Sequence, residues 1–250
     1  MKKFQVGIAL GGGGSRGFVH LGVYKALLEL GIQPEIIAGT SAGAIAGSFL
    51  AAGLSVDEVH ARFRDKGIYK ISRIHFPIDG LMVMDGLKKM LDDLNYKRIE
   101  DLPIPFIATV TNLNSGKVEY RSKGPLAEIV TASASIPMLF SPVEIEGKQY
   151  VDGGVFDNLP VEPIQKLCKK TIAVNIMPVP EKDNVHNLIQ MARRVFNLSV
   201  HGASINRAME CDILIEPSGL EKYDILTNKK ADKLFEIGYN YTINLHKLKQ

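Results

Sequence analysis

Cysteine is scarce in this 250-residue chain, which contains only Cys168 and Cys211. Two cysteines cannot form the dense disulfide framework of many small secreted proteins, and neither lies in a spacing that binds metal. A chain of this length can bury a large hydrophobic core without such cross-links. We therefore expect two buried free thiols in a protein that has no metal site and no cofactor.

The sequence also lacks a strong excess of charge of either sign. Its 30 Lys and Arg residues face 27 Asp and Glu residues, for a net charge of +3, and the basic residues are spread along the chain. This distribution argues against a dedicated nucleic-acid-binding protein. A weak attraction to anionic membrane surfaces stays open.

Long hydrophobic runs are missing as well. No stretch approaches the roughly 20 apolar residues that a membrane-spanning helix needs. The segment Met1 to Leu10 places two lysines before an apolar run, as a signal peptide does. Glycines interrupt this run at once and no cleavage site follows, so we interpret it as a first buried strand. We expect a cytoplasmic protein, with peripheral membrane association left open; the sequence does not indicate an oligomeric state.

What is present is the composition of an ordinary globular protein, with 46% hydrophobic and 23% charged residues. The length fits one domain over residues 1–250. A strand (5–10), a glycine loop (11–14), a helix (18–30), a second strand from residue 34 and a helix (42–52) follow one another. This order predicts an α/β fold whose central sheet is mainly parallel and whose crossovers are right-handed.

The rest of the chain continues this mixture of helices and strands. Ser55 to Glu58 form a capping box at the start of a helix. Asp85 is expected to cap a helix that ends near Leu94. The remaining expected strands are 106–113, 117–122, 143–145, 149–151, 171–177 and 212–216, and the remaining expected helices are 125–133, 185–210 and 231–248.

The most informative motif is Gly39-Thr40-Ser41-Ala42-Gly43. It fits the G-x-S-x-G nucleophile elbow, in which a serine lies on a sharp turn between a strand and a helix. An apolar run leads in and a helical run leads out, as the elbow requires. Gly39 and Gly43 would allow the strand and helix to approach closely, because glycine has no Cβ.

A second glycine-rich motif, Gly11 to Gly17, follows the first strand. Its glycines at 12, 14 and 17 also fit the dinucleotide pattern G-x-G-x-x-G, but the acidic residue expected at the end of the second strand is absent, since Glu35 comes too early. A glycine loop before a helix presents backbone N–H groups to a negative charge. In an acyl-transfer enzyme that charge is the oxyanion of the tetrahedral intermediate, so we interpret the loop as an oxyanion hole rather than a phosphate cradle.

A serine nucleophile needs a base, and Asp152 is the first candidate. It precedes Gly153 and Gly154 at the end of a predicted strand, where the sites of α/β proteins gather. Histidine is the usual base, and the order Ser…Asp…His would select His186 or His201, with Asp152 orienting the ring. Both histidines fall on or near late helices, so the triad is the secondary hypothesis.

The segment 74–84 is apolar, is interrupted by proline and glycine, and has no clear period. Its side chains would suit the wall of an acyl-chain site or a lid that touches a membrane. A connection packed into the core is the equal alternative.

Taken together, these motifs resemble the patatin-like phospholipase family in its small bacterial form. The resemblance extends over residues 4–177 and includes the stretches Ala132 to Pro142 and Asp157 to Pro160. It implies a three-layer α/β/α fold and hydrolysis of lipid acyl esters without metal, with a helical region 180–250 that carries no catalytic signature. The implied site consists of the nucleophile Ser41, the base Asp152, the oxyanion loop Gly12, Gly13 and Gly14, and the supporting residues Arg16, Gly17, Gly39, Gly43, Gly153 and Gly154.

The resemblance leaves two points open. Arg16 matches a basic position of the family, but either substrate binding or anchoring of the loop would explain it. The same dyad would also serve an esterase or thioesterase with a non-lipid substrate. A non-catalytic scaffold that keeps the fold is a further alternative, which the presence of both Ser41 and Asp152 disfavours.

Overall fold

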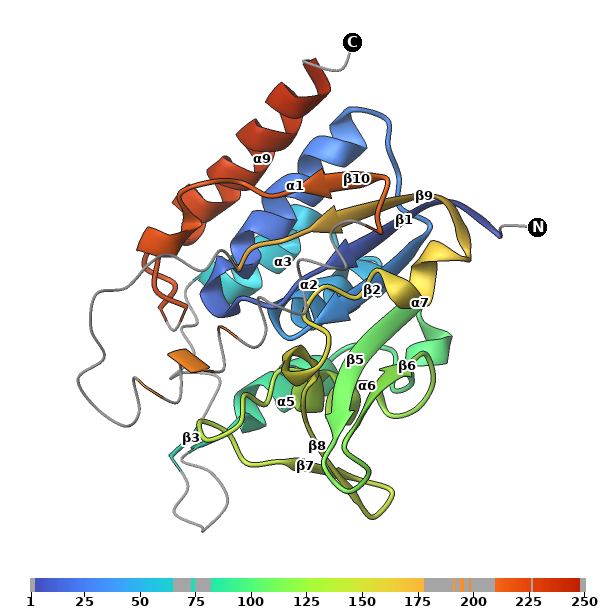
Figure 1. Cartoon of the computed structure of the whole chain (residues 1–250), viewed down its shortest axis with the longest axis vertical. Helices are drawn as coiled ribbons and strands as arrows, with labels where there is room; N and C mark the ends of the chain where they lie inside the picture. The colour runs from blue at the N-terminus through green and yellow to red at the C-terminus, as the bar shows by residue number, and fades with distance from the viewer. Residues whose placement is uncertain are drawn as a thin grey trace.

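The structure is a computed structural model, in which residues 3–64, 73–74, 82–177, 191, 194–195, 198, 210–225 and 227–247 are described. A central sheet runs through the molecule (Figure 1). Five of its strands are parallel in the order β10-β9-β1-β2-β5, which confirms the predicted mainly parallel sheet. These strands are β1 (Phe4–Leu10), β2 (Ile36–Thr40), β5 (Phe106–Asn112), β9 (Cys168–Val174) and β10 (Ile213–Ile215).

Antiparallel strands complete one side of the sheet. Both β6 (Lys117–Arg121) and β8 (Lys148–Asp152) pair with β5, and β7 (Val143–Ile145) pairs with β8. Glu146 and Gly147 make the tight turn between β7 and β8, and both have positive φ, as a two-residue hairpin turn of this kind requires. Two further strands, β3 (Arg73–Ile74) and β4 (Met82–Val83), form a separate small ribbon.

Side chains that alternate along the strands divide the core between the two faces of the sheet. Ile8 and Leu10 of β1 belong to the larger cluster, whereas Ala9 between them belongs to the smaller one. The smaller cluster includes Ile164 of the short helix α7 (Glu162–Gln165), which the sequence did not predict. The helices on the larger face are α1 (Phe18–Glu29), α2 (Ala42–Ala51), α3 (Val56–Arg64), α5 (Asp85–Asp92), α6 (Leu126–Ser133) and α9 (Ala231–Lys247).

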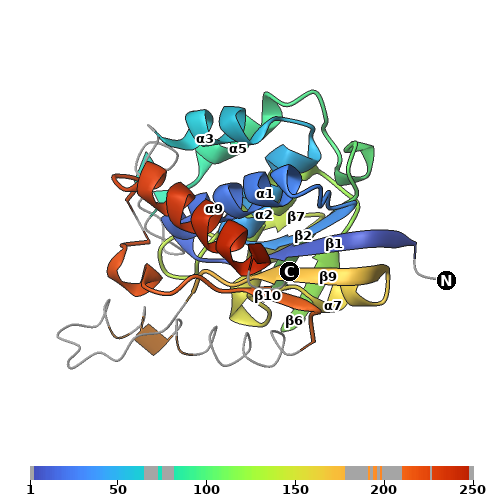
Figure 2. The ribbon, with the colours of Figure 1, turned by 90° about the horizontal axis from the view of Figure 1, so that it is seen from above.

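Helices on both faces make this a three-layer α/β/α arrangement, as Figure 2 shows from above. The last helix, α9, packs along α1, although the two are at opposite ends of the described chain (Figure 1). Their backbones approach closely at Gly22, where an added Cβ would collide with the Phe235 carbonyl, and at Gly238, where it would collide with the Val19 carbonyl. Residues far apart in sequence are therefore held together on the face that carries the site.

Of two helix starts predicted from the sequence, one is confirmed and the other is displaced by one residue. The capping box is confirmed, because the Ser55 N–H donates to Glu58 Oε2 at 2.8 Å and the Glu58 N–H donates to Ser55 Oγ at 3.3 Å. The predicted cap at Asp85 is wrong by one residue, since Met84 is the N-cap and makes no side-chain cap bond. Most of the predicted helix 185–210 lies outside the described residues.

Candidate active site

Ser41 lies at the sharp bend between β2 and α2. Its φ of 53° and ψ of −119° are strained for a residue with a side chain. The predicted role of the flanking glycines is confirmed. A Cβ at Gly39 would lie 2.5 Å from the Gly43 carbonyl oxygen, and one at Gly43 would collide with the Leu10 carbonyl. The bend can therefore form only where both positions lack a side chain.

Hydrogen bonds to Ser133 on α6 and to the Asp157 carbonyl hold this strained bend. The Ser41 N–H donates to Ser133 Oγ at 3.0 Å, and the Ser133 hydroxyl donates to the Thr109 carbonyl at 2.7 Å. The Thr40 hydroxyl donates to the Asp157 carbonyl at 3.0 Å. Strained conformations persist where the surroundings over-determine them, and these bonds do so here.

Asp152 reaches the same place by an unexpected route. We predicted it at the carboxyl end of a strand, where parallel α/β sheets gather their sites, but β8 runs antiparallel to β5. The register explains the position: Asp152 pairs with Val110, while Thr40 pairs with the adjacent Thr109. Thus β8 begins beyond the carboxyl end of β5. It runs back along β5 until Asp152 is level with Ser41.

Burial tunes the carboxyl of Asp152. The residue is only 2% exposed, and desolvation raises its pKa to about 7. The nearby Ser41 side chain and the hydrogen bond from the Gly154 N–H at 2.7 Å lower this pKa, but desolvation outweighs them. An ordinary aspartate is a weak base, whereas a carboxylate with a pKa near 7 is well matched to proton transfer at neutral pH.

The glycine loop lies directly against Ser41, since a Cβ added to Gly12 would be 3.1 Å from the Cβ of Ser41. The Gly12 N–H donates to the Asn158 carbonyl at 3.0 Å, so it is already occupied. Within the part of the chain that the structure describes, the N–H groups of Gly13 and Gly14 have no acceptor. These two groups are the donors that the loop can offer to a ligand.

His20 holds this loop through a hydrogen bond to its backbone. It is completely buried, its Nε2 donates to the Gly11 carbonyl at 2.7 Å, and burial lowers its pKa to about 4. The ring is therefore neutral at pH 7 and bonds to the backbone rather than to Ser41 or Asp152. The two histidines considered for a triad, His186 and His201, lie outside the described residues.

Arg16 anchors a distant segment of the chain. Arg16 is 6% exposed, and its guanidinium donates to the Tyr223 carbonyl from Nε at 3.1 Å and from Nη2 at 3.0 Å. The Ser15 hydroxyl donates to the Asp224 carbonyl at 2.6 Å, and the Ser15 N–H to the Ile225 carbonyl at 2.8 Å. We call residues 221–225 the strap. Of the two roles left open for Arg16, these contacts support anchoring.

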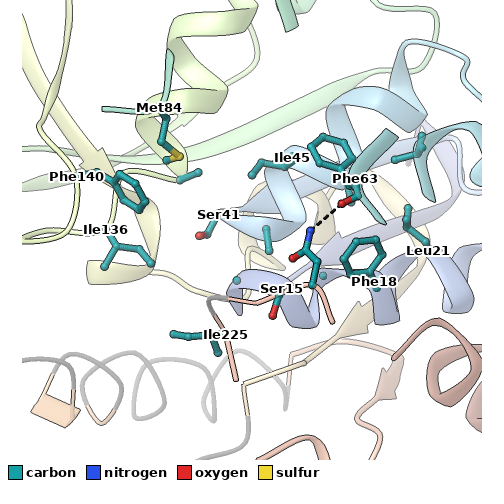
Figure 3. Close-up of a pocket in the computed structure, with 17 residues that line it drawn as sticks. Ser15, Phe18, Leu21, Ser41, Ile45, Phe63, Met84, Ile136, Phe140 and Ile225 are labelled. Atoms are coloured by element: carbon teal, nitrogen blue, oxygen red, sulfur yellow. Dashed lines mark hydrogen bonds between the residues drawn. The ribbon is translucent and has the colours of Figure 1, made fainter. Parts of the chain in front are cut away.

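An apolar pocket of about 760 Å³ opens beside Ser41 (Figure 3). This volume is all the space between the lining atoms, including the part that is open to solvent. Sequence analysis missed most of its lining, and in particular Ile225 and Asn228, which come from a region without a recognisable motif. The lining residues are Gly14, Ser15, Gly17, Phe18, Leu21, Ser41, Ala42, Ile45, Ala46, Val59, Phe63, Met84, Ala134, Ile136, Phe140, Ile225 and Asn228.

The segment 74–84 contributes Met84 to this lining, and residues 75–81 lie outside the described residues. Cys168 and Cys211 are not joined in a disulfide, as expected; Cys168 is buried as predicted, whereas Cys211 is only half-buried. No group of three metal-binding side chains occurs among the residues that the structure describes. In the same part of the chain, no helix has the length and apolar character needed to cross a membrane.

Comparison with known proteins decides the family. A sequence model described as "Patatin-like phospholipase" matches residues 8–164, which include the glycine loop, the elbow and Asp152. The chain belongs to the patatin-like phospholipase family. An uncharacterized NTE family protein of Mycobacterium bovis is 35% identical over 179 residues, which is 69% of this chain and 49% of that protein.

Fungal lysophospholipases are also similar to this patatin-like chain. Lysophospholipase NTE1 of Kluyveromyces lactis is 29% identical over 94% of this chain but only 19% of its own length. The chain thus spans about half of the mycobacterial relative and a small part of the fungal one. The crystal structure of VipD from Legionella pneumophila has the same fold, with a TM-score of 0.53 at 16% identity. The match covers 98% of this chain and 67% of the VipD chain.

Proposed function

We propose that this protein is a serine hydrolase of lipid acyl esters that uses Ser41 and Asp152 as a catalytic dyad. The observation that carries the proposal is the buried Asp152 carboxyl, which lies level with Ser41 in the sheet and whose pKa is raised to about 7 by desolvation. Because Asp152 lies beside Ser41, we assign it the role of the base itself, rather than that of a residue that orients a histidine. The names of the fungal lysophospholipases and the apolar pocket support a substrate with an acyl chain.

The reaction would proceed through an acyl-enzyme. Ser41 Oγ attacks the ester carbonyl while Asp152 takes the hydroxyl proton, and the N–H groups of Gly13 and Gly14 stabilise the oxyanion. The intermediate collapses, Asp152 returns the proton to the departing alcohol, and the acyl group remains on Ser41. Water, activated by Asp152, then attacks this ester and releases the fatty acid.

Activity assays with two variants test the dyad. Ser41→Ala and Asp152→Asn should each lower kcat by about 10³-fold or more, as in other serine hydrolase sites. A fluorophosphonate probe should label wild-type Ser41 and leave Ser41→Ala unlabelled. Near-normal activity of Asp152→Asn would contradict the dyad, and loss of activity in His186→Gln or His201→Gln would favour the triad instead.

A substrate panel separates the lipid hydrolase from the alternatives. Lysophospholipid, diacyl phospholipid, short-chain ester and acyl thioester should be compared by kcat/KM. We expect the highest value for a long-chain acyl ester, because its chain can bury apolar surface in the pocket. A preference for short esters or thioesters would support the non-lipid alternative, and failure of Ser41 to label would support a non-catalytic scaffold.

A further inference from the structure

Asn158 is a buried polar residue for which the proposed dyad has no use. It is 4% exposed and lies between η3 (Gly153–Val155), which follows Asp152, and α7. A buried amide side chain normally has a definite hydrogen-bonding partner. Here the partner of the side chain is Gly12, in the glycine loop.

Two hydrogen bonds join these residues. The Gly12 N–H donates to the Asn158 backbone carbonyl at 3.0 Å, and Asn158 Nδ2 donates to the Gly12 carbonyl at 3.3 Å. The fit has no room for a side chain on the loop, because an added Cβ at Gly12 would collide with Asn158 Oδ1. Asn158 therefore holds Gly12 at both its N–H and its carbonyl.

The side-chain bond has a consequence for the next residue. The Gly12 carbonyl and the Gly13 N–H belong to one planar, trans peptide group, so they point in opposite directions. Fixing the carbonyl on Asn158 fixes the direction of the Gly13 N–H, which has no acceptor among the described residues. Without the bond, the peptide group could rotate and turn this donor away.

The same residue is also held on the side of the base. A Cβ added to Gly154 would be 2.9 Å from Asn158 Oδ1 and 3.0 Å from Asp152 Oδ1, so the amide and the carboxyl flank one glycine. The preceding residue, Asp157, accepts the Thr40 hydroxyl beside Ser41. Asn158 thus connects the turn that carries the base to the loop beside the nucleophile.

We propose that Asn158 is a positioning residue that orients the Gly12–Gly13 peptide, so that the Gly13 N–H stabilises the oxyanion. This inference rests on the proposed hydrolase function. Loss of a direct oxyanion donor lowers kcat by about 10² to 10³. Loss of the residue that orients the donor should have a smaller effect, about 10- to 100-fold, and should act on kcat rather than KM because the pocket is unchanged.

The test compares Asn158→Ala with Asn158→Leu, which keeps most of the volume but cannot donate. Asn112→Ala is the matched control, since Asn112 is 1% exposed, its Nδ2 donates to Glu119 on β6, and its Oδ1 accepts from the Asn114 N–H in the turn after β5. Both Asn158 variants should lose kcat to a similar extent, change KM less than about threefold, and react more slowly with the fluorophosphonate. The pH midpoint of kcat/KM should stay unchanged, because the hydrogen bonds to Asp152 are retained.

Several results would overturn the positioning role. Undiminished kcat in a folded Asn158→Ala, or normal kcat in Asn158→Leu alone, would show that the donor is unimportant. A loss of kcat matched by a similar loss in Asn112→Ala, or by a proportional rise in KM, would indicate a general structural defect. If wild-type Ser41 does not react with the probe at all, both the proposed function and this inference fail.

Discussion

The backbone N–H of Ser41 donates to the hydroxyl of Ser133 at 3.0 Å, and this bond ties the strained elbow to the end of helix α6. The hydroxyl in turn donates to the Thr109 carbonyl on β5. A single buried side chain therefore connects the nucleophile to both the helix and the sheet, and its removal leaves two backbone groups without their partner.

Ser133→Ala should lower the free energy of unfolding by about 1–3 kcal/mol, since a buried polar group left unpaired costs about that much. It should also lower kcat, because the Ser41 backbone can relax. Urea unfolding and ester hydrolysis measure the two effects. Ser135→Ala is the matched control: Ser135 donates to the Thr131 carbonyl, which also accepts from the Ala134 N–H. Equal effects in the two variants would contradict the special role of Ser133.

The raised pKa of Asp152 predicts the pH dependence of the reaction. The base must be ionised to accept the Ser41 proton, so kcat/KM should rise with pH, with a midpoint near the pKa of about 7, and level off above it. A pH–rate profile with a neutral ester measures the midpoint. A midpoint near 4 would show that desolvation does not act on Asp152 as argued.

The raised pKa of Asp152 also makes the stability of the fold depend on pH. The pKa of Asp152 rises from 3.8 in the unfolded chain to about 7 in the folded one. Its contribution to stability is therefore greatest below pH 3.8 and is lost as the pH rises through 7. Asp152→Asn, which removes this titration, should gain stability relative to wild type between pH 3.8 and about pH 7, where the folded wild-type chain holds a proton that the unfolded chain has released. The free energy of unfolding should be measured for both proteins across this pH range. A constant difference between the two would contradict the pKa shift.

Arg16→Lys should weaken the attachment of the strap. A lysine cannot donate to the Tyr223 carbonyl from two positions at once, and hydrogen bonds from a charged group contribute about 1.5–3 kcal/mol. We expect a loss of stability of that order and faster proteolysis near residues 221–225. Arg98→Lys is the control, because its ion pair with Glu100 is exposed and should contribute little to stability. Equal losses would mean that Arg16 does not act through the strap.

Ala46→Leu should shorten the acyl chain that the pocket accepts. Ala46 lies on α2 about one turn beyond Ser41, and its side chain faces the pocket. Each methylene that no longer fits loses about 0.8 kcal/mol of burial, so kcat/KM for long-chain esters should fall while short esters react normally. Ala61→Leu, at an exposed position on α3, should change neither. A uniform loss for all chain lengths would point to misfolding instead.

The elements that could be predicted from sequence are those with a local cause. Glycine at positions 39 and 43 predicts the elbow, because the close approach of strand and helix excludes any side chain there. Apolar runs between helices predict parallel strands. The short strands 143–145 and 149–151 could also be predicted, and they form the hairpin of β7 and β8. Its register could not, because pairing depends on the tertiary fit of the strands, and the register is what brings Asp152 level with Ser41.

Contacts with backbone carbonyls were the least predictable part of the site. Arg16 binds the Tyr223 carbonyl, and the strap then brings Ile225 to the pocket; any residue type supplies such a carbonyl, so the sequence carries no signal for it. The role inferred for Asn158 had a faint signal, since its motif formed part of the family resemblance. Nothing in the motif itself indicated a bond to Gly12.

The anchoring of the strap bears on how the protein is made. Synthesis proceeds from the N-terminus, so Ser15 and Arg16 leave the ribosome long before residues 221–225 exist. During that interval the buried guanidinium of the folded state has no carbonyls to bind, and the pocket lacks the wall that Ile225 provides. Contacts between such distant residues also slow folding, because a long loop must close before they can form. A nascent chain would therefore carry the complete elbow and both dyad residues and still lack a finished substrate site.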